Sequence, residues 1–539
     1  MLPDLTTIKD LLPEISLIAL AMWIYIGGTI ATQRQWWSWF SLAAYVVVGF
    51  MLYKQDLIMW PYLSETDGGA VTGPLVIDYL GHATRWIAVA MGFVFTLMSS
   101  RLIGRRTASE FLATLMLLVV GVMIVARAND LVLMFLGLEL VSIPTYVLLF
   151  LGRGDRSSAE ATTKYFFLSI LSSAVLLYGF SFLYGMAGTT VLMGTEGNPG
   201  IREMLGTMTQ SEVADGLGRF APFALILILA GLGFRLAAVP FHFYAPDVYQ
   251  GTTNANAGLL TVAPKIVGIV GIIRLIVATM PLSAHLGWQL VIVLSILTMT
   301  IGNVAALWQK NLRRLMAYSS IAHAGYMLIG LTVALAGRNQ GLVENGGVAA
   351  MYLYLLVYVV ASAGIFAALS FLSSEDREVN TLDDISGVAS RHPAIAGAVA
   401  LFMFSLAGIP PLAGFWGKFS LFGGAISAAA NVDHAATSSW LITLAIVGVL
   451  NAAIAAAYYL RVIATMYFYS SSREEDARGG WEAAVATGLC AFTVVALGIL
   501  PGSIMRTSRL AEQSAIAGTT VKASSTLAAY QTDARVDER

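Results

Sequence analysis

The chain has 539 residues, of which 57% are hydrophobic and only 12% are charged, and its formal net charge is −1. The charged share is about half that of a soluble domain, and the near-zero net charge gives no sign of a nucleic-acid-binding protein. The single cysteine, Cys490, excludes a disulfide framework. It also excludes an iron–sulfur cluster or zinc ribbon bound by this chain alone, because those sites need several thiolates.

Apolar runs of about 18 or more residues recur along the whole length, and each is long enough to cross a bilayer. They predict an all-α polytopic membrane protein with about fourteen transmembrane helices. The first run is expected to be a retained helix, because the start MLPDLTTIKDLLPE lacks the basic region and cleavage site of a signal peptide. The expected spans are 14–32, 36–53, 84–101, 111–127, 130–151, 164–187, 221–245, 257–279, 287–307, 314–336, 347–373, 394–428, 438–469 and 482–503.

Lysine and arginine in the short loops predict the orientation of the chain. With fourteen spans, the basic residues of four loops fall on one side of the membrane, and the positive-inside rule assigns that side to the cytoplasm. The 188–220 loop, which carries Glu196, Glu203, Glu212 and Asp215, then lies on the outer side with both termini. The basic loop residues are Arg101, Arg105, Arg106, Arg153, Arg156, Lys310, Arg313, Arg473 and Arg478.

Two of the expected spans are predicted to be broken at prolines inside their apolar runs. Span seven has Pro240 and Pro246, and span twelve has Pro410 and Pro411. Proline frees helical carbonyls, so such breaks survive in a membrane where they face protein or water. The two breaks are five spans apart, which indicates two inverted repeats of five helices. The expected units are helices one to three at 1–110, the first repeat (helices four to eight) at 111–280, the second repeat (helices nine to thirteen) at 281–470, and helix fourteen with a polar tail at 471–539.

Four ionisable residues lie deep inside apolar runs, namely Glu139 in span five, Arg235 in span seven, Lys265 in span eight and Lys418 in span twelve. A charge at the membrane centre costs about 2.5–3.5 kcal/mol, so such residues pair with each other or face water. Snorkelling to the interface is the alternative for long basic side chains. It is weak for Lys265, about 12 Å from the nearer end of its span. A purely structural ion pair between Glu139 and Arg235 stays open.

Three further residues extend this set. His242 follows Arg235 by seven residues, which would place both on one helix face if the helix continued past the break. His323, in YSSIAHAGYMLIG of span ten, is either a hydrogen-bonded core residue or a proton carrier. Lys164 follows Glu160 by four residues, so a local ion pair is the alternative to a functional role. Buried lysine, glutamate and histidine can pass protons as their surroundings change, and these residues together predict a proton path across the membrane.

Several stretches of the sequence resemble the antiporter-like membrane subunits of respiratory complex I, and most closely the subunit N branch of the bacterial NADH:quinone oxidoreductases. The resemblance covers nearly the whole chain. It implies a fourteen-helix fold with two inverted repeats, and a proton-translocating subunit driven by quinone reduction elsewhere in the complex. The similar stretches are LVLMFLGLELVSIPTYVLLF, SSAEATTKYFFLS, YGMAGTT, GLGFRLAAVPFHFYAPDVYQG, NLRRLMAYSSIAHAGY and LAGIPPLAGFWGKF.

The resemblance implies roles for most of the buried polar residues, and this sequence departs from the family at one of them. The family usually has lysine where this chain has Arg235. Arginine is effectively always protonated, so Arg235 can form an ion pair but should not release a proton. A second departure is GTTNANAG after DVYQ, where relatives commonly have a GAP-type sequence. The residues that match family positions are Glu139 (span five), Lys164 (span six), Lys265 (span eight, central), Lys418 (span twelve, exit side), His242 and His323.

The resemblance also implies where the rest of the machinery lies. It implies that NAD, FMN, iron–sulfur clusters and quinone are held by partner subunits and that this chain binds no cofactor or metal. The expected partners are other membrane subunits of the complex, in a bacterial inner membrane with both termini on the periplasmic side, and the whole is a translocase. Two alternatives remain open: a subunit of a cation/proton antiporter of the Mrp type, and a structural subunit whose charges only hold helices together.

Overall fold

The computed structural model of the chain describes residues 5–31, 33–65, 70–104, 107–152, 154–194, 197–208, 216–280, 284–339, 346–374, 377–432, 434–470 and 479–516. Several loop residues used above to predict orientation lie outside these ranges. They are Arg105, Arg106, Arg153, Glu196, Glu212, Asp215, Arg473 and Arg478.

The described part of the chain is built almost entirely of helices. The first half comprises α1 (Leu5–Asp10), α2 (Leu12–Ile30), α3 (Arg34–Glu65), the strands β1 (Ala70–Thr72) and β2 (Leu75–Ile77), α4 (Tyr79–Ser99), α5 (Ala108–Arg127), α6 (Leu131–Gly152), α7 (Arg156–Ala187), α8 (Ile201–Gly206), η1 (Leu217–Phe220), α10 (Ala221–Leu236), α11 (Ala245–Gly251), α12 (Asn254–Ile272) and the π-helical η2 (Ile273–Ala278). The second half comprises α13 (Ala284–Leu307), α14 (Leu312–Asn339), α15 (Gly347–Phe371), η4 (Asp383–Ile385), α16 (Val388–Arg391), α17 (Pro393–Ala407), α18 (Ala413–Asn431), α19 (Ala435–Phe468), α20 (Gly480–Ile499) and α21 (Gly502–Ile516).

Thirteen helical stretches of the described chain are long and apolar enough to cross a membrane. The prediction of an all-α polytopic membrane protein is confirmed. The expected twelfth span is the one missing from the thirteen, because it is divided into α17, which is too short at 15 residues, and α18, which has 19 residues but is not apolar enough. The exact number of spans and the inverted repeats stay predictions.

The segment after the second expected span differs from the prediction of a loop over 54–83. Helix α3 continues to Glu65, and β1 and β2 then pair as an antiparallel hairpin with Val71 opposite Val76. Lys54 and Asp56 lower the hydropathy of this segment, and lysine costs little in helix propensity. Hydropathy therefore placed the end of the span too early, while the helix itself continues.

Both spans that were expected to break at prolines are interrupted, whereas α6 and α12 continue through Pro144 and Pro264. Helix α10 ends at Leu236, where Ala237 takes a left-handed conformation with φ of 56°, and α11 begins only at Ala245. Helix α17 ends at Ala407, followed by Gly408 with φ of 90°, a value that glycine adopts without steric strain. Each interruption leaves carbonyl groups at a helix end that need donors from elsewhere.

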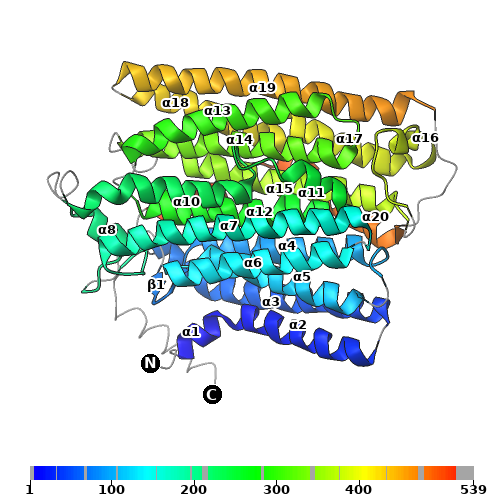
Figure 1. Cartoon of the computed structure of the whole chain (residues 1–539), viewed down its shortest axis with the longest axis horizontal. Coiled ribbons are helices and arrows are strands. Elements are labelled where there is room, and N and C mark those ends of the chain that lie inside the picture. The colour runs from blue at the N-terminus through cyan, green and yellow to red at the C-terminus, as the bar shows by residue number, and fades with distance from the viewer. Residues whose placement is uncertain are drawn as a thin grey trace.

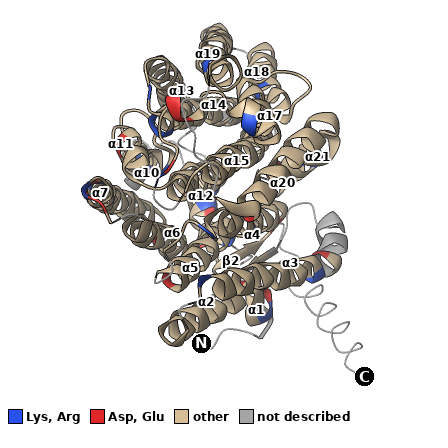
Figure 2. Ribbon diagram, turned by 90° about the vertical axis from the view of Figure 1, so that its right-hand side faces the viewer, with Lys and Arg blue, Asp and Glu red and all other residues tan. Residues whose placement is uncertain are grey.

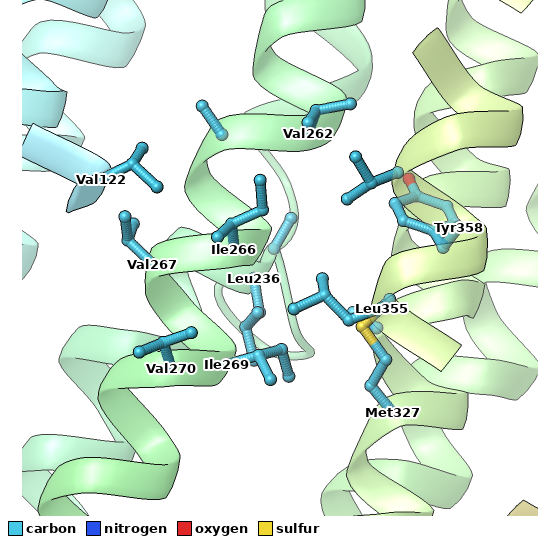
Figure 3. Close-up of a cluster of buried hydrophobic side chains, with 14 of the residues drawn as sticks. Val122, Leu236, Val262, Ile266, Val267, Ile269, Val270, Met327, Leu355 and Tyr358 are labelled. Carbon is cyan, nitrogen blue, oxygen red and sulfur yellow. The ribbon is translucent and has the colours of Figure 1, made fainter. Parts of the chain in front are cut away.

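The long helices lie side by side in one bundle, with α8 at one end and α16 at the other (Figure 1). Seen along the helices, α12 and α15 lie near the middle of the bundle, while α2, α7 and α19 lie at its edges (Figure 2). Every residue of α12 is buried. Apolar side chains of α12 pack there against Leu236 from the end of α10, Met327 from α14, and Leu355 from α15 (Figure 3). The helix that carries Lys265 therefore has no side facing lipid.

Candidate functional site

Glu139 on α6 and Arg235 on α10 form an ion pair. One guanidinium nitrogen of Arg235, Nη2, lies 3.2 Å from Glu139 Oε1, and Nη1 donates to Ser142 Oγ at 2.6 Å and to the Leu138 carbonyl at 3.2 Å. Ser173 on α7 donates to the same carboxylate oxygen at 2.5 Å. Arg235 is buried, whereas the side chain of Glu139 is 19% exposed. The pair thus joins three helices and leaves the carboxylate reachable from outside this chain.

Arg235 is the second-last residue of α10, directly before the break. Because the helix ends there, Tyr244 can turn back from the following segment and donate to the Phe234 carbonyl at 2.9 Å. The Cβ of Arg235 packs against α12, 3.7 Å from where a side chain on Gly268 would begin. Gly268 is three residues after Lys265, so the fixed charge of Arg235 lies on a helix that packs about one turn from that lysine.

Lys265 is buried on α12 without an acidic partner among the residues that the structure describes. Its Nζ donates to Ser320 Oγ on α14 at 2.5 Å and lies 5.8 Å from the ring centre of Tyr358 on α15. Tyr358 also donates to Ser320 Oγ, at 2.9 Å, and the Tyr249 hydroxyl on α11 lies 3.4 Å from the same oxygen. Lys265 therefore contacts neutral hydroxyls only.

His323 lies one turn after Ser320 on α14 and is held between two phenols. Its Nδ1 is 2.6 Å from the Tyr354 hydroxyl on α15, and its Nε2 is 2.8 Å from the Tyr459 hydroxyl on α19. A neutral imidazole has one donor and one acceptor nitrogen, so each phenol can either give or take a hydrogen bond here. The ring of Tyr358 lies 4.9 Å from the imidazole, centre to centre. His323 is thus the next polar group beyond Ser320 and Tyr358.

Lys418 is the last member of this row. Its Nζ donates to the Ala407 carbonyl at 2.9 Å, which is one of the groups freed where α17 ends. The same ammonium lies 4.9 Å from the ring centre of Tyr326, and that ring contacts His323. Lys418 is buried and, like Lys265, forms no ion pair within the described residues. The break in span twelve therefore supplies the acceptor for its lysine.

The structure brings Lys265, His323 and Lys418 into one row of buried polar contacts, which we call the central row. Its other members are hydroxyl groups from α14, α15 and α19: Ser319, Ser320, Tyr326, Tyr354, Tyr358 and Tyr459. The tyrosines were not expected from the sequence. A tyrosine in an apolar run is more often a packing residue. Only their positions around His323 distinguish the tyrosines of the central row from packing residues.

Lys164 and His242 do not make contacts with the central row. Lys164 is 42% exposed at the start of α7 and pairs with Glu160 at 2.7 Å, the local ion pair considered above, and with Asp247 at 3.2 Å. Arg314 also pairs with Asp247, at 2.7 Å. Burial acts to raise the pKa of Asp247, but the hydrogen bonds from Arg314 and Lys164 outweigh it and lower the pKa below its usual value.

His242 does not share a helix face with Arg235, because the helix does not continue past the break and α10 stops at Leu236. His242 lies in the turn between α10 and α11, and its Nδ1 is buried without a hydrogen-bond partner within the described chain. Pro240 lacks a backbone N–H and disfavours continuation of the helix, and here α10 ends four residues before it.

Sequence reasoning missed a second group of buried charges, at the opposite end of α12 from its first turn. Arg274 and Asp78 form a two-bond ion pair at 2.5 and 2.7 Å, with both side chains fully buried. Nearby, Arg85 pairs with Glu14 at 2.8 Å. Asp78 and Glu14 lie at helix starts, where a carboxylate is ordinary, so nothing in the sequence alone linked them to arginines far along the chain.

Comparison with known proteins agrees with this geometry. A family model described as the transmembrane region of NADH:quinone oxidoreductase and Mrp antiporter subunits matches residues 128–456. NADH-quinone oxidoreductase subunit N from Rhodospirillum rubrum is 37% identical over 473 residues, which are 87% of this chain and 89% of that protein.

Solved structures show the same fold. A chain of respiratory complex I from Thermus thermophilus superposes with a TM-score of 0.70 at 29% identity, covering 92% of this chain and 98% of that one. A chain of the Mrp complex from Dietzia sp. has a TM-score of 0.76 at 19% identity, covering 95% and 100%, which shows a shared fold only. The described residues contain no group of three or more His, Cys, Asp and Glu side chains placed to hold a metal ion. The chain belongs to the subunit N family of NADH-quinone oxidoreductases, the membrane subunits of complex I.

Proposed function

We propose that this chain conducts protons across the membrane within an NADH-quinone oxidoreductase, and that the central row is its path. The observation that carries the proposal is the pair of buried lysines, Lys265 and Lys418, which contact only hydroxyls, an aromatic ring and a carbonyl. A buried charge without a counter-ion is expensive in a membrane and is typical of transport pathways. A lysine can hold or release a proton, whereas an arginine in the same place would stay charged.

Glu139 and Arg235 would control the charge of Lys265. While the two are paired, the carboxylate offsets the arginine charge. If Glu139 moves away, a permanent positive charge remains on α10 beside Gly268, about one turn from Lys265. Like charges repel, so this state favours release of the proton from Lys265 toward Ser320 and His323. The partly exposed position of Glu139 suits a signal that arrives from a neighbouring subunit.

Proton transport against a membrane potential needs an energy source outside this chain. Moving one elementary charge across 100 mV costs about 2.3 kcal/mol. In our proposal that energy comes from quinone reduction, and NAD, FMN, iron–sulfur clusters and quinone are bound by partner subunits of the translocase. We place the chain in a bacterial inner membrane, with its basic loops in the cytoplasm and both termini in the periplasm, following the loop charges.

The test is Lys265→Ala in the assembled complex, with NADH oxidation and proton pumping measured on the same vesicles. We expect the complex to assemble and pumping to be lost. Lys54→Ala, the same change at an exposed lysine near the end of α3, is the matched control and should pump normally. Unchanged pumping stoichiometry by an intact Lys265→Ala complex would exclude this path and favour a purely structural role for the buried charges.

The chain shares its fold with a chain of an Mrp complex, and this supports one alternative function. The alternative is a subunit of a cation/proton antiporter that works without redox partners. Purification from native membranes distinguishes the two. Flavin and iron–sulfur subunits that copurify with the chain support the proposal. Their absence, together with sodium-dependent proton transport, would replace it with the antiporter function.

A further inference from the structure

Asn303 is a fully buried amide on α13, a helix that also has an exposed apolar face. Val293 and Leu297 of the same helix are exposed, whereas Asn303 has no exposed surface. A polar side chain inside a membrane-spanning helix is costly unless its hydrogen bonds are made within the protein. The partners of this amide therefore indicate what it does.

Both ends of the Asn303 amide form hydrogen bonds. Its Nδ2 donates to the Tyr326 hydroxyl on α14 at 3.1 Å and to Asn451 Oδ1 on α19 at 3.1 Å. Its Oδ1 accepts from the Tyr458 hydroxyl on α19 at 3.0 Å. Asn451 in turn donates to Thr300 Oγ1 at 3.3 Å, so all four amide atoms have a partner. One amide thus joins two tyrosines that come from different helices.

The backbones of α13 and α14 touch directly beside this bond. A Cβ added to Gly302 would lie 2.6 Å from a backbone nitrogen of α14, and one added to Gly325 would lie 2.5 Å from a backbone nitrogen of α13. Small residues at such positions let membrane helices approach closely. Gly302 precedes Asn303 and Gly325 precedes Tyr326. The close approach of the two helices therefore sets the distance between the amide and the phenol.

The ring that this bond holds faces Lys418. The ammonium nitrogen Nζ lies 4.9 Å from the centre of the Tyr326 ring, and the imidazole of His323 lies 5.8 Å from the same ring, centre to centre. The face of an aromatic ring attracts a cation within about 6 Å, most strongly in a desolvated site. A neutral amine gains no such attraction. The position of the Tyr326 ring therefore favours the protonated form of Lys418.

The second phenol approaches His323 from the opposite side. Tyr458 packs against Tyr459 with ring centres 4.4 Å apart, and the Tyr459 hydroxyl lies 2.8 Å from His323 Nε2. Asn303 is therefore linked to His323 through Tyr458 and Tyr459, and to Lys418 through Tyr326. It lies outside the central row and acts on it only through these phenols.

Few charged groups compete with the ring for Lys418. Helices α14, α15, α17, α18 and α19 contain no aspartate or glutamate, and Glu482 on α20 is already in an ion pair. The other titratable groups that face this lysine are His323, within electrostatic reach on α14, and Tyr354, which packs on Gly417 from α15. A change in the position of the Tyr326 ring is thus not masked by a nearby carboxylate.

We propose that Asn303 is a positioning residue of the proton path, which holds the Tyr326 ring against Lys418 so that this lysine can accept a proton. This inference rests on the proton-conducting function proposed above and adds a residue of α13 to it. The alternative is a purely structural role, in which the amide only joins α13, α14 and α19. A positioning residue changes how readily Lys418 is protonated, whereas a structural one changes stability alone.

The position of the ring is tested by a density map of the assembled complex that carries Asn303→Leu, a change that removes every hydrogen bond of the amide. We expect the centre of the Tyr326 ring to lie more than about 6 Å from Lys418 Nζ, beyond the range of a cation–π contact. A ring that stays at 4.9 Å would overturn the proposal. This readout does not involve pumping, so it stands or fails separately from the Lys265→Ala test.

The effect on Lys418 is tested by the pH profile of proton pumping. In Asn303→Leu, pumping should fall off on the alkaline side at a pH lower by about 0.4–1.5 units, the shift that corresponds to one cation–π contact. Asn451→Leu is the matched control, because it removes the neighbouring amide but no bond to a tyrosine. It should lower heat stability and keep the native pH profile. The same profile for both variants would leave Asn303 with a structural role only.

Two changes at Tyr326 test the link itself. Tyr326→Phe removes only the hydroxyl that Asn303 binds, and should shift the profile in the same direction even if Asn303→Leu fails to assemble. Tyr326→Leu removes the ring, and adding Asn303→Leu to it should shift the profile no further, since residues that act through one contact are not additive. A further shift in the double variant would contradict the proposal.

Discussion

Lys265 and Arg274 are buried on the same helical stretch, nine residues and about 13 Å apart, yet their surroundings differ in one respect. Arg274 forms two hydrogen bonds with Asp78 and donates to the Ala126 carbonyl. Lys265 contacts hydroxyls and no carboxylate in the described chain. The comparison separates an arginine, which is always charged and is paired here, from a lysine that has no counter-ion in the described chain and can change its charge.

The difference has a physical reason. Removing a proton or a partner from a tightly bound buried pair leaves one charge uncompensated in a low-dielectric interior, which is costly. Such a pair is therefore suited to holding helices together. A lysine among neutral hydroxyls has no such constraint, and small movements of nearby charges can decide whether it is protonated. The surroundings of Arg274 thus suit it to holding helices together, and those of Lys265 suit it to the proton transfer that we propose.

The largest effect is expected for Arg274→Leu, which leaves Asp78 buried and unpaired. Breaking a buried ion pair in this way costs about 3–5 kcal/mol. Thermal unfolding of the purified complex, and the amount of chain in the membrane, measure this loss. Adding Asp78→Asn should recover part of the stability because it removes the stranded charge. A fully stable Arg274→Leu protein would show that Arg274 contributes no more to stability than Lys265 does. The distinction between the two residues would then be wrong.

A smaller effect is expected for Arg235→Lys, which keeps a charge but not the planar group that reaches Glu139, Ser142 and the Leu138 carbonyl at once. We expect assembly to be retained with a loss of about 1–2 kcal/mol, equal to one or two hydrogen bonds. Pumping should persist. A severe loss of pumping by a stable variant would show that a permanent charge at this position is required, and would sharpen the distinction between fixed and variable cations.

The smallest effect is expected for Asp247→Asn, in the half-exposed pairs with Lys164 and Arg314. Exposed pairs contribute at most about 1 kcal/mol, so the variant should lose little stability at neutral pH. Because the pKa of Asp247 is lowered in the folded chain, its contribution is present above the usual aspartate pKa and is lost as the pH falls through the lowered value. Unfolding measured across acidic pH should therefore show the native and variant proteins converging at the low end.

The class of fold and one group of buried charges (Glu139, Arg235, Lys265 and Lys418) were predictable from the sequence, because long apolar runs and rare charges are strong signals in a membrane protein. The second group, which includes Arg274 and Asp78, was missed. The pairing of Glu139 with Arg235 was also expected, and the structure has it. Breaks near Pro240 and Pro410 could be predicted because proline disfavours a continuous helix, although α6 and α12 continue through Pro144 and Pro264.

Most other contacts between distant segments could not be predicted. The sequence does not say which face of α15 meets α14, so Tyr354 and Tyr358 gave no sign that they surround His323. The sequence alone does not explain why GTTNANAG is polar. In the structure this segment forms hydrogen bonds with Leu148, Ser373 and Arg313. Hydropathy also ended the second span too early, because a lysine or aspartate lowers hydropathy without ending a helix.

The complete burial of α12 has a consequence for how the protein is made. The helical stretch of α12 and η2, which carries Lys265, Arg274 and several amides and presents no side to lipid, is a poor substrate for release from the translocon by itself. Its partners α5 and α10 precede it in translation, but α15 follows only after α13 and α14. Membrane insertion of this chain should therefore be completed late, with α12 retained beside the insertion machinery until α15 emerges and closes the bundle around it.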